Sequence, residues 1–204
     1  MLAISTATKK AMIAIDADSK KLYCEIDADC RQSEKMMQEL HTLLVKNKLT
    51  LKDVGNFALV IGPGSFTGLR IGAALIKGFC AGMPEKRVVA IPTLDLMAAE
   101  VLKEVKPKGN FSCYMSAQSG LFYAATYNKK GEKLEEEKLL KAAEILQGKE
   151  AKFCLAEEAF LPYGITLTPE TLLERAIELE KNAGMIAAKD ISIKYIRRSS
   201  AEEK

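Results

Sequence analysis

The sequence has no tryptophan, a single histidine and no closely spaced pair of cysteines. Because none of its five cysteines belongs to a CxxC motif, we expect no zinc site built on thiolates. An HExxH zinc-protease motif is also missing, and spacing alone joins the lone His41 to no nucleophile. Small buried thiols are the simplest interpretation of the cysteines in apolar stretches. The five are Cys24, Cys30, Cys80, Cys113 and Cys154.

Long hydrophobic runs are absent too. No stretch approaches the roughly 20 apolar residues that span a bilayer. The chain does not open with a charged segment followed by an apolar one, as a secretory signal does. We therefore expect a cytoplasmic protein with reduced thiols and no membrane partner.

The sequence carries no large excess of charge of either sign. Its 30 basic and 27 acidic residues give a net charge of +3 and are spread along the chain. Composition therefore forces no large basic face, and direct binding of nucleic acid by this chain alone is not favoured. A basic cluster of Lys194, Arg197 and Arg198 could contact phosphate, but a solvated tail is the favoured interpretation.

The length and the hydrophobic content of the sequence are typical of a packed globular protein. The chain has 204 residues, of which 48% are hydrophobic, enough to bury a core without disulfides or metals. Its first half alternates as strands do and then changes to helical spacing. This pattern predicts strands over 1–5, 11–16, 22–26, 57–61 and 87–91, and helices over 34–47, 68–82 and 93–105.

The second half reopens in the same way after Pro107-Lys108-Gly109. We expect strands over 111–115, 121–127 and 152–156, a surface loop over 129–141 leading to a short helix, and a helix over 170–182. Because both halves open with a β-meander, we predict an α/β fold of two related domains. Their predicted bounds are 1–106 and 107–204, and the second is the smaller and ends in a flexible tail.

A glycine-rich loop stands between the strand over 57–61 and the next helix, where free backbone N–H groups favour an anion. A Walker A motif needs Gly-Lys-Ser/Thr at its end, but Leu69 follows Gly68, and a G-x-G-x-x-G motif needs its third glycine one residue earlier. A tight turn with Ser65 or Thr67 as helix cap is therefore favoured over phosphate binding. The candidate loop residues are Gly62, Gly64, Ser65, Thr67, Gly68 and Arg70.

The helix over 68–82 contains an unusual number of glycines and alanines for a helix interior. Each interior glycine costs about 1 kcal/mol relative to alanine, and small residues allow another backbone to approach closely. We therefore expect this helix to pack on its own sheet and also on a partner helix. The helix over 34–47 offers a stripe of Met36, Met37, Leu40 and Leu44, which suits an interface, although a core position is the favoured interpretation of the stripe alone.

The run from Gly62 to Arg70, together with Ile71-Gly72 and Lys77-Gly78, resembles the GPGSFTGLRIG…KG stretch of the TsaB family, also called YeaZ. The match is almost letter for letter. Three shorter stretches are also similar to the family: residues 2–8 to its LALDTST, Gln32-Ser33-Glu34 to its HSE, and Tyr195-Ile196-Arg197 to its YLR.

The resemblance implies the actin-like (ASKHA, ribonuclease H-like) fold of two related α/β domains. It also implies a non-catalytic scaffold that pairs with its paralogue TsaD, which transfers threonylcarbamoyl to ANN-decoding tRNAs, with TsaE as an ATPase. Contact with tRNA would occur only through this complex, and the chain alone would form a homodimer. Pairing would use the helices over 34–47 and 68–82, whose candidate interface residues are Met36, Met37, Leu40, Leu44, Leu69, Gly72, Ala73, Ile76 and Phe79.

The sequence departs from nucleotide-using members of this fold at the opening hairpin of each half. Those members place an acidic residue there to hold magnesium, whereas Ser5 and Ser116 occupy the two positions here, and a neutral hydroxyl cannot supply that charge. Gln32 likewise replaces the family's histidine. We therefore expect no metal, no cofactor and no independent catalysis. An ATP-dependent small-molecule kinase or acyltransferase of the same fold is the alternative, and a homodimeric binding module is a third hypothesis.

Overall fold

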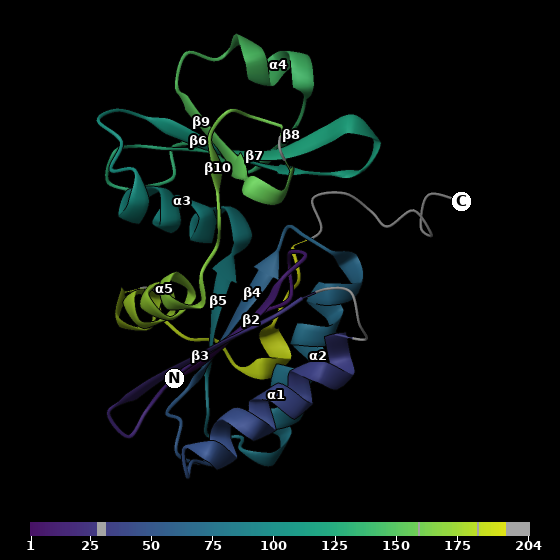
Figure 1. Cartoon of the computed structure of the whole chain (residues 1–204), viewed down its shortest axis with the longest axis vertical. Coiled ribbons are helices and arrows are strands. Elements are labelled where there is room, and N and C mark those ends of the chain that lie inside the picture. Colours follow the sequence, from purple (N-terminus) through teal and green to yellow (C-terminus); the bar gives the residue numbers. More distant parts are fainter. Residues whose placement is uncertain (28–31, 159, 183, 195–204) are drawn as a thin grey trace. The chain divides into compact units, whose positions relative to one another are not determined.

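The computed structural model describes residues 1–27, 32–158, 160–182 and 184–194 (Figure 1). Their contacts form two compact units. Unit 1 consists of Met1–Pro92 and Thr168–Lys194, and the described part of unit 2 is Thr93–Leu167. The features predicted at Cys30 and over 195–198 lie outside the described residues, as do the side chains of Gln32 and Ser33.

Unit 1 is built on a five-stranded mixed sheet in the order β3-β2-β1-β4-β5. β1 is antiparallel to β2, with Ile4 opposite Ile13, and parallel to β4, with Leu2 opposite Phe57. The predicted meander and the predicted buried strand after it are therefore confirmed. The strands are β1 (Leu2–Ser5), β2 (Ala11–Ala17), β3 (Lys20–Ile26), β4 (Phe57–Gly62) and β5 (Val88–Pro92).

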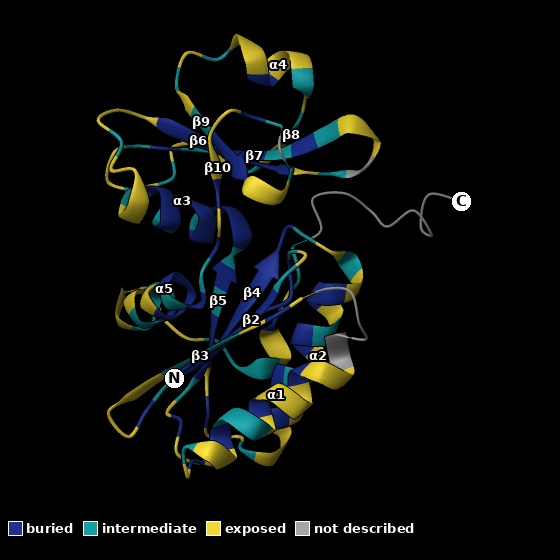
Figure 2. Ribbon diagram, viewed as in Figure 1, coloured by how far each residue is buried: buried dark blue, intermediate teal, exposed yellow. Residues whose placement is uncertain are grey.

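Helices cover both faces of this sheet, which is why β1 and β4 are buried along their whole length (Figures 1 and 2). Leu2, Ile4 and Ile13 share a core with side chains of α1 and α2, while α5 contacts β1, β2, β3 and β5. The Asn56 amide also donates to Glu180 of α5 at 2.8 Å. The helices are α1 (Gln32–Lys46), α2 (Phe66–Gly82) and α5 (Pro169–Asn182), and a short turn η3 (Ala188–Asp190) follows.

Unit 2 repeats the strand order of unit 1 on a smaller scale. Its sheet runs β10-β9-β6-β7-β8, with β6 antiparallel to β7 and parallel to β9, which confirms the predicted duplication at the level of topology. The helix α4 has 6 residues where α1 has 15, and β10 has 2 where β5 has 5. The elements are α3 (Thr93–Glu104), β6 (Phe111–Ser116), η1 (Gln118–Gly120), β7 (Leu121–Tyr127), β8 (Lys138–Lys141), α4 (Ala142–Gln147), β9 (Ala151–Leu155), η2 (Ala156–Glu158) and β10 (Gly164–Ile165).

The two units exchange helices relative to the order of the sequence. α3 follows β5 of the first sheet but packs on β6, β7 and β10, whereas α5 follows β10 and packs on the first sheet. The division by contacts therefore differs from the sequence boundary expected at 106/107. A boundary predicted from a turn signal divides the chain into two continuous segments. Each helix instead packs its apolar face on a sheet that can be formed by the other segment, as α3 and α5 do.

A buried polar network ties α3 to the hairpin that follows β7. The Tyr127 hydroxyl donates to Asp95 at 2.8 Å, and the Lys133 ammonium lies 2.8 Å from both Asp95 and the nearly buried Glu137. Burial, reinforced by the charge of Asp95, raises the pKa of Tyr127 well above its usual range. Burial opposes the charge on Lys133, but its hydrogen bonds to Asp95 and Glu137 leave the pKa of Lys133 raised.

Two short strands escaped prediction. The loop expected over 129–141 is wrong at its end, because β8 pairs antiparallel with β7 there and places Leu140 opposite Phe122. β10 was not predicted at all, since Gly164 and Ile165 become a strand only through their parallel pairing with β9. Within the described ranges, none of the helices is long and apolar enough to cross a bilayer.

Candidate functional site

The glycine loop joins β4 to α2 and is held against the β1–β2 hairpin. Ser65 caps α2 by accepting from the Gly68 N–H at 3.2 Å, and its own N–H donates to the Ala7 carbonyl at 2.8 Å. Ser65 is therefore the cap, and Thr67 is exposed beside it. Arg70 stacks on the ring of Phe66, with its guanidinium carbon 3.8 Å from the ring centre.

Close approach of that hairpin explains the glycines at the start of α2. A Cβ on Gly64 would overlap the backbone of Ala7, and one on Gly68 would overlap the carbonyl of Thr6. A Cβ on Gly72 would lie 2.6 Å from the Thr6 hydroxyl and 2.9 Å from a methyl of Leu59. Since real Cβ atoms do not approach backbone so closely, the fold requires Gly64 and Gly68, while a side chain at Gly72 would need the side chains of Thr6 and Leu59 to shift.

The two hairpin serines are in different settings. Ser5 and Thr6 are buried, and neither hydroxyl has a hydrogen-bond partner among the described residues. Ser116 is exposed, and its backbone N–H donates to both carboxylate oxygens of Glu158 at 2.9 and 3.0 Å. Across the part of the chain that the structure describes, no group of three or more His, Cys, Asp or Glu side chains could hold a metal ion.

Eight of the nine candidate interface residues are buried in unit 1 itself. Met36, Leu40 and Leu44 of α1 are between 1% and 6% exposed, and Phe79 of α2 packs against Phe57 with ring centres 5.9 Å apart. They fix the helices on the sheet, so most of their surface is not available to another chain in this fold. The eight are Met36, Leu40, Leu44, Leu69, Gly72, Ala73, Ile76 and Phe79.

Met37 is the exception, because it is 42% exposed on the outer side of α1. His41 and Val45 follow it at helical spacing, and both are exposed as well. The single histidine of the sequence is thus a surface side chain of α1. The sequence alone does not distinguish Met37 from Met36, because adjacent residues of a helix differ only in the direction in which their side chains point.

The outer side of α2 carries the small residues that the fold does not explain. Ala74, Gly78, Ala81 and Gly82 are exposed at a spacing of one helical stripe. A Cβ on Gly78 or Gly82 would meet nothing within 4 Å. The described part of the chain therefore offers no compensation for the helix-weakening effect of Gly78, which lies in the helix interior. We call this stripe, with Met37, His41 and Val45 of α1, the outer helix face; exposed positions run along both helices in Figure 2.

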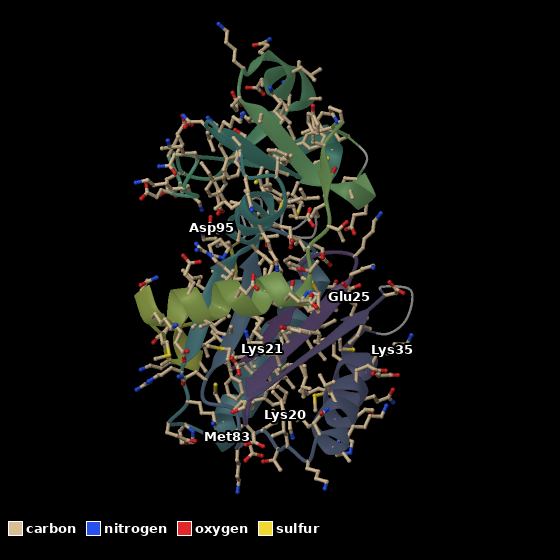
Figure 3. The ribbon with its side chains drawn as sticks, turned by 60° about the vertical axis from the view of Figure 1, so that its left-hand side comes forward. Lys20, Lys21, Glu25, Lys35, Met83 and Asp95 are labelled. Atoms are coloured by element: carbon tan, nitrogen blue, oxygen red, sulfur yellow. The ribbon has the colours of Figure 1, made fainter. Side chains whose placement is uncertain are left out.

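An apolar groove of about 590 Å³ adjoins the outer helix face. It lies between the second half of α1, the loop over 49–52 and the end of α2. Met83, which is labelled in Figure 3, follows the last residue of α2. Most of its lining is apolar, so a hydrophobic side chain could be buried there. The lining residues are Met37, Leu40, His41, Leu44, Val45, Leu49, Thr50, Leu51, Lys52, Gly82 and Met83.

The chain is similar to known proteins in both sequence and structure. The profile of the family described as "TsaD: tRNA N6-adenosine threonylcarbamoyltransferase" matches residues 27–188. The chain is 32% identical over 74 residues to the tRNA threonylcarbamoyladenosine biosynthesis protein TsaB of Buchnera aphidicola subsp. Baizongia pistaciae, covering 35% of this chain and 34% of that protein. It is 30% identical over 98 residues to the TsaB protein of Escherichia coli, covering 48% of this chain and 42% of that protein.

The chain thus matches less than half the length of either of these curated relatives. Structural similarity extends further along the chain. The structure of YeaZ from Pseudomonas aeruginosa superposes with a TM-score of 0.78, covering 95% of this chain and 98% of that one at 20% sequence identity. The fold is therefore the actin-like α/β fold that the sequence predicted.

Proposed function

This chain belongs to the TsaD family, described as tRNA N6-adenosine threonylcarbamoyltransferase, and we propose that it acts in the biosynthesis of threonylcarbamoyladenosine on tRNA as a partner-binding subunit. The relatives named TsaB support this pathway. In this proposal a paralogous TsaD subunit carries out the transfer, and TsaE is the ATPase of the same assembly. When TsaD is absent, the same surface of this chain forms a homodimer.

The observation that carries the proposal is the outer helix face. Gly78 and Gly82 leave open space on α2, so a partner helix can approach the backbone more closely than side chains would allow. The apolar groove beside them can accept a side chain from that helix, and the exposed Met37 and Val45 add apolar contact area. Anchors that fill a pocket at the centre of an interface provide most of its binding energy.

The setting of the two hairpins supports a binding role over ATP-dependent chemistry. Neither Ser5 nor Ser116 can provide a negative charge for magnesium, and Ser5 is 1% exposed. Two N–H groups of the glycine loop are already engaged, Ser65 with the Ala7 carbonyl and Gly68 with the Ser65 hydroxyl. Among the contacts described for this loop, none favours the kinase or acyltransferase alternative.

The test is light scattering after size exclusion, with this chain mixed with TsaD from the same organism. The wild-type chain should form a stoichiometric complex, and Gly78→Leu should weaken it by about 2 kcal/mol, roughly thirtyfold in Kd, because the new side chain holds the partner helix away. Gly109→Leu is the matched control, since a Cβ there also meets nothing within 4 Å but the residue lies in unit 2.

Two outcomes would contradict the proposal in different ways. Separate elution of the wild-type chain and TsaD at micromolar concentration would remove the role as a partner-binding subunit. A complex that Gly78→Leu and Gly109→Leu leave equally strong would keep the role but place the interface away from the outer helix face.

A further inference from the structure

A second hollow in unit 1 shares no lining residue with the apolar groove. It has a volume of about 350 Å³ and lies between the last turns of α2, the turn before β5 and the η3 turn. Two neighbouring segments and one distant segment each bring a cation to it: Lys77 from α2, Arg87 from the turn and Lys189 from η3. We call this feature the basic hollow.

Every charged side chain that lines the basic hollow is positive. Lys77, Arg87 and Lys189 are exposed, and none of their side chains has an ion pair with a carboxylate in the described ranges. Lys86 also lines the hollow, but it is only 9% exposed and its ammonium donates to the backbone carbonyls of residues 52, 54 and 55. Its charge is therefore used within the fold, while the other three are available to a ligand.

The acidic residues nearest in sequence do not remove this charge. Glu85 and Asp190 adjoin lining residues but are not part of the lining. Cys80 forms part of the wall, and burial, followed by the charge of Glu85, raises the pKa of its thiol, which keeps it neutral. The lining of the basic hollow thus combines cations with neutral, mostly apolar side chains.

A structural role accounts for only part of this cluster. The helix dipole does not explain the three cations, because α2 has no basic residue in its last turn, and Arg87 and Lys189 lie outside α2. Like charges brought together repel one another unless an anion lies between them. The guanidinium fork of an arginine can bind two phosphate oxygens at once, and lysines add point charges around it.

We propose that the basic hollow binds a phosphodiester group of an RNA backbone, which differs from the expectation that this chain contacts tRNA only through the complex. Its volume of about 350 Å³ is at the small end of ligand pockets and suits one phosphate with part of its sugar. The choice of RNA over a free phosphate compound rests on the proposed function in tRNA modification. The hollow also adjoins Ala81 of the outer helix face, so RNA held there would lie next to a bound partner.

The first experiment follows the backbone amide resonances of the full chain during titration with an unmodified transcript of an ANN-decoding tRNA. Shifts should be largest around residues 77, 87 and 189. The triple variant Lys77→Gln, Arg87→Gln, Lys189→Gln should lose at least about tenfold in affinity, and the dependence of log K on log salt should fall by about two to three units. The control Lys21→Gln, Lys149→Gln, Lys181→Gln removes the same charge from exposed lysines elsewhere, Lys21 being on β3 (Figure 3).

Equal losses in the two triple variants, or shifts confined to other residues, would overturn the inference. A second titration uses inorganic pyrophosphate. Saturation of the same amides by pyrophosphate, with no tighter binding of the transcript, would overturn the assignment to RNA in favour of a small phosphate compound.

The proposed function can fail independently. A chain that binds no TsaD but still binds the transcript through the basic hollow would refute the partner role and leave this inference standing. A chain that binds TsaD, but whose triple variant and control variant bind the transcript equally well, would keep the partner role and refute the proposed RNA site.

Discussion

Alanine substitutions at two glycines of one helix should change stability in opposite directions. Gly72 and Gly78 both lie in the interior of α2, six residues apart, so replacement by alanine removes the same backbone freedom at each. On propensity alone, either change would add about 1 kcal/mol to the free energy of unfolding.

The surroundings of the two glycines reverse one of these effects. The new methyl at Gly78 enters open space, so Gly78→Ala should keep the full gain of about 1 kcal/mol, or roughly 2–4 °C in Tm for a chain of this size. The methyl at Gly72 would lie 2.6 Å from the Thr6 hydroxyl and 2.9 Å from Leu59. Overpacking of this kind costs about 1–3 kcal/mol, so Gly72→Ala should be neutral to destabilising by up to about 2 kcal/mol.

The assay is urea denaturation of the isolated chain, followed by far-ultraviolet circular dichroism at a concentration where light scattering shows a monomer. The monomer matters because a homodimer formed through α2 would oppose the gain at Gly78. A Gly78→Ala chain that is less stable than wild type would refute the reasoning, because the helix would then need that glycine for an internal reason. A Gly72→Ala chain stabilised as much as Gly78→Ala would show that the hairpin does not press on α2.

Two further predictions concern buried polar groups. Ser5→Ala should leave the free energy of unfolding unchanged or slightly higher, because the buried hydroxyl has no hydrogen-bond partner among the described residues. Ser5→Asp should lower the free energy of unfolding by about 3 kcal/mol or more, because it buries a carboxylate. Urea denaturation of both variants tests this, and a Ser5→Asp chain as stable as wild type would contradict it. Stability should fall as pH rises above about 10, because Tyr127 and Lys133 have raised pKa values and so hold protons in the folded chain that the unfolded chain releases. Tyr127→Phe should flatten that fall in urea titrations between about pH 8 and 11, and an unchanged profile would exclude Tyr127 as its source.

Much of the fold follows from local pattern. The continuous apolar run over 57–61 became β4, the alternation at the start became the β1–β2–β3 meander, and residues 36, 40 and 44 turned one side of α1 to the core. The strands that escaped prediction have little local signal. Lys138-Leu139-Leu140-Lys141 reads as part of a charged loop, and only its pairing with β7 makes it a strand.

The sequence pointed to the helix α2 as part of the candidate site, but it did not show which side of that helix is exposed. The excess of small residues singled out α2, yet its near-uniform apolarity gave no indication of which side would face the sheet. Gly72 and Gly78 are equivalent in sequence, and they differ because Thr6 of the β1–β2 hairpin and Leu59 of β4 approach only Gly72. Cations from three segments gather in the basic hollow by the same kind of non-local contact, which composition cannot reveal.

The exchange of helices between the units also constrains how the protein emerges from the ribosome. The strands of the first sheet are all synthesised by Pro92, but the helix that covers their second face begins only at Pro169. The described part of unit 2, in contrast, lies between Thr93 and Leu167 and is synthesised before α5. The first sheet is therefore covered only late in synthesis, and until α5 arrives it exposes an apolar face that a chaperone could recognise.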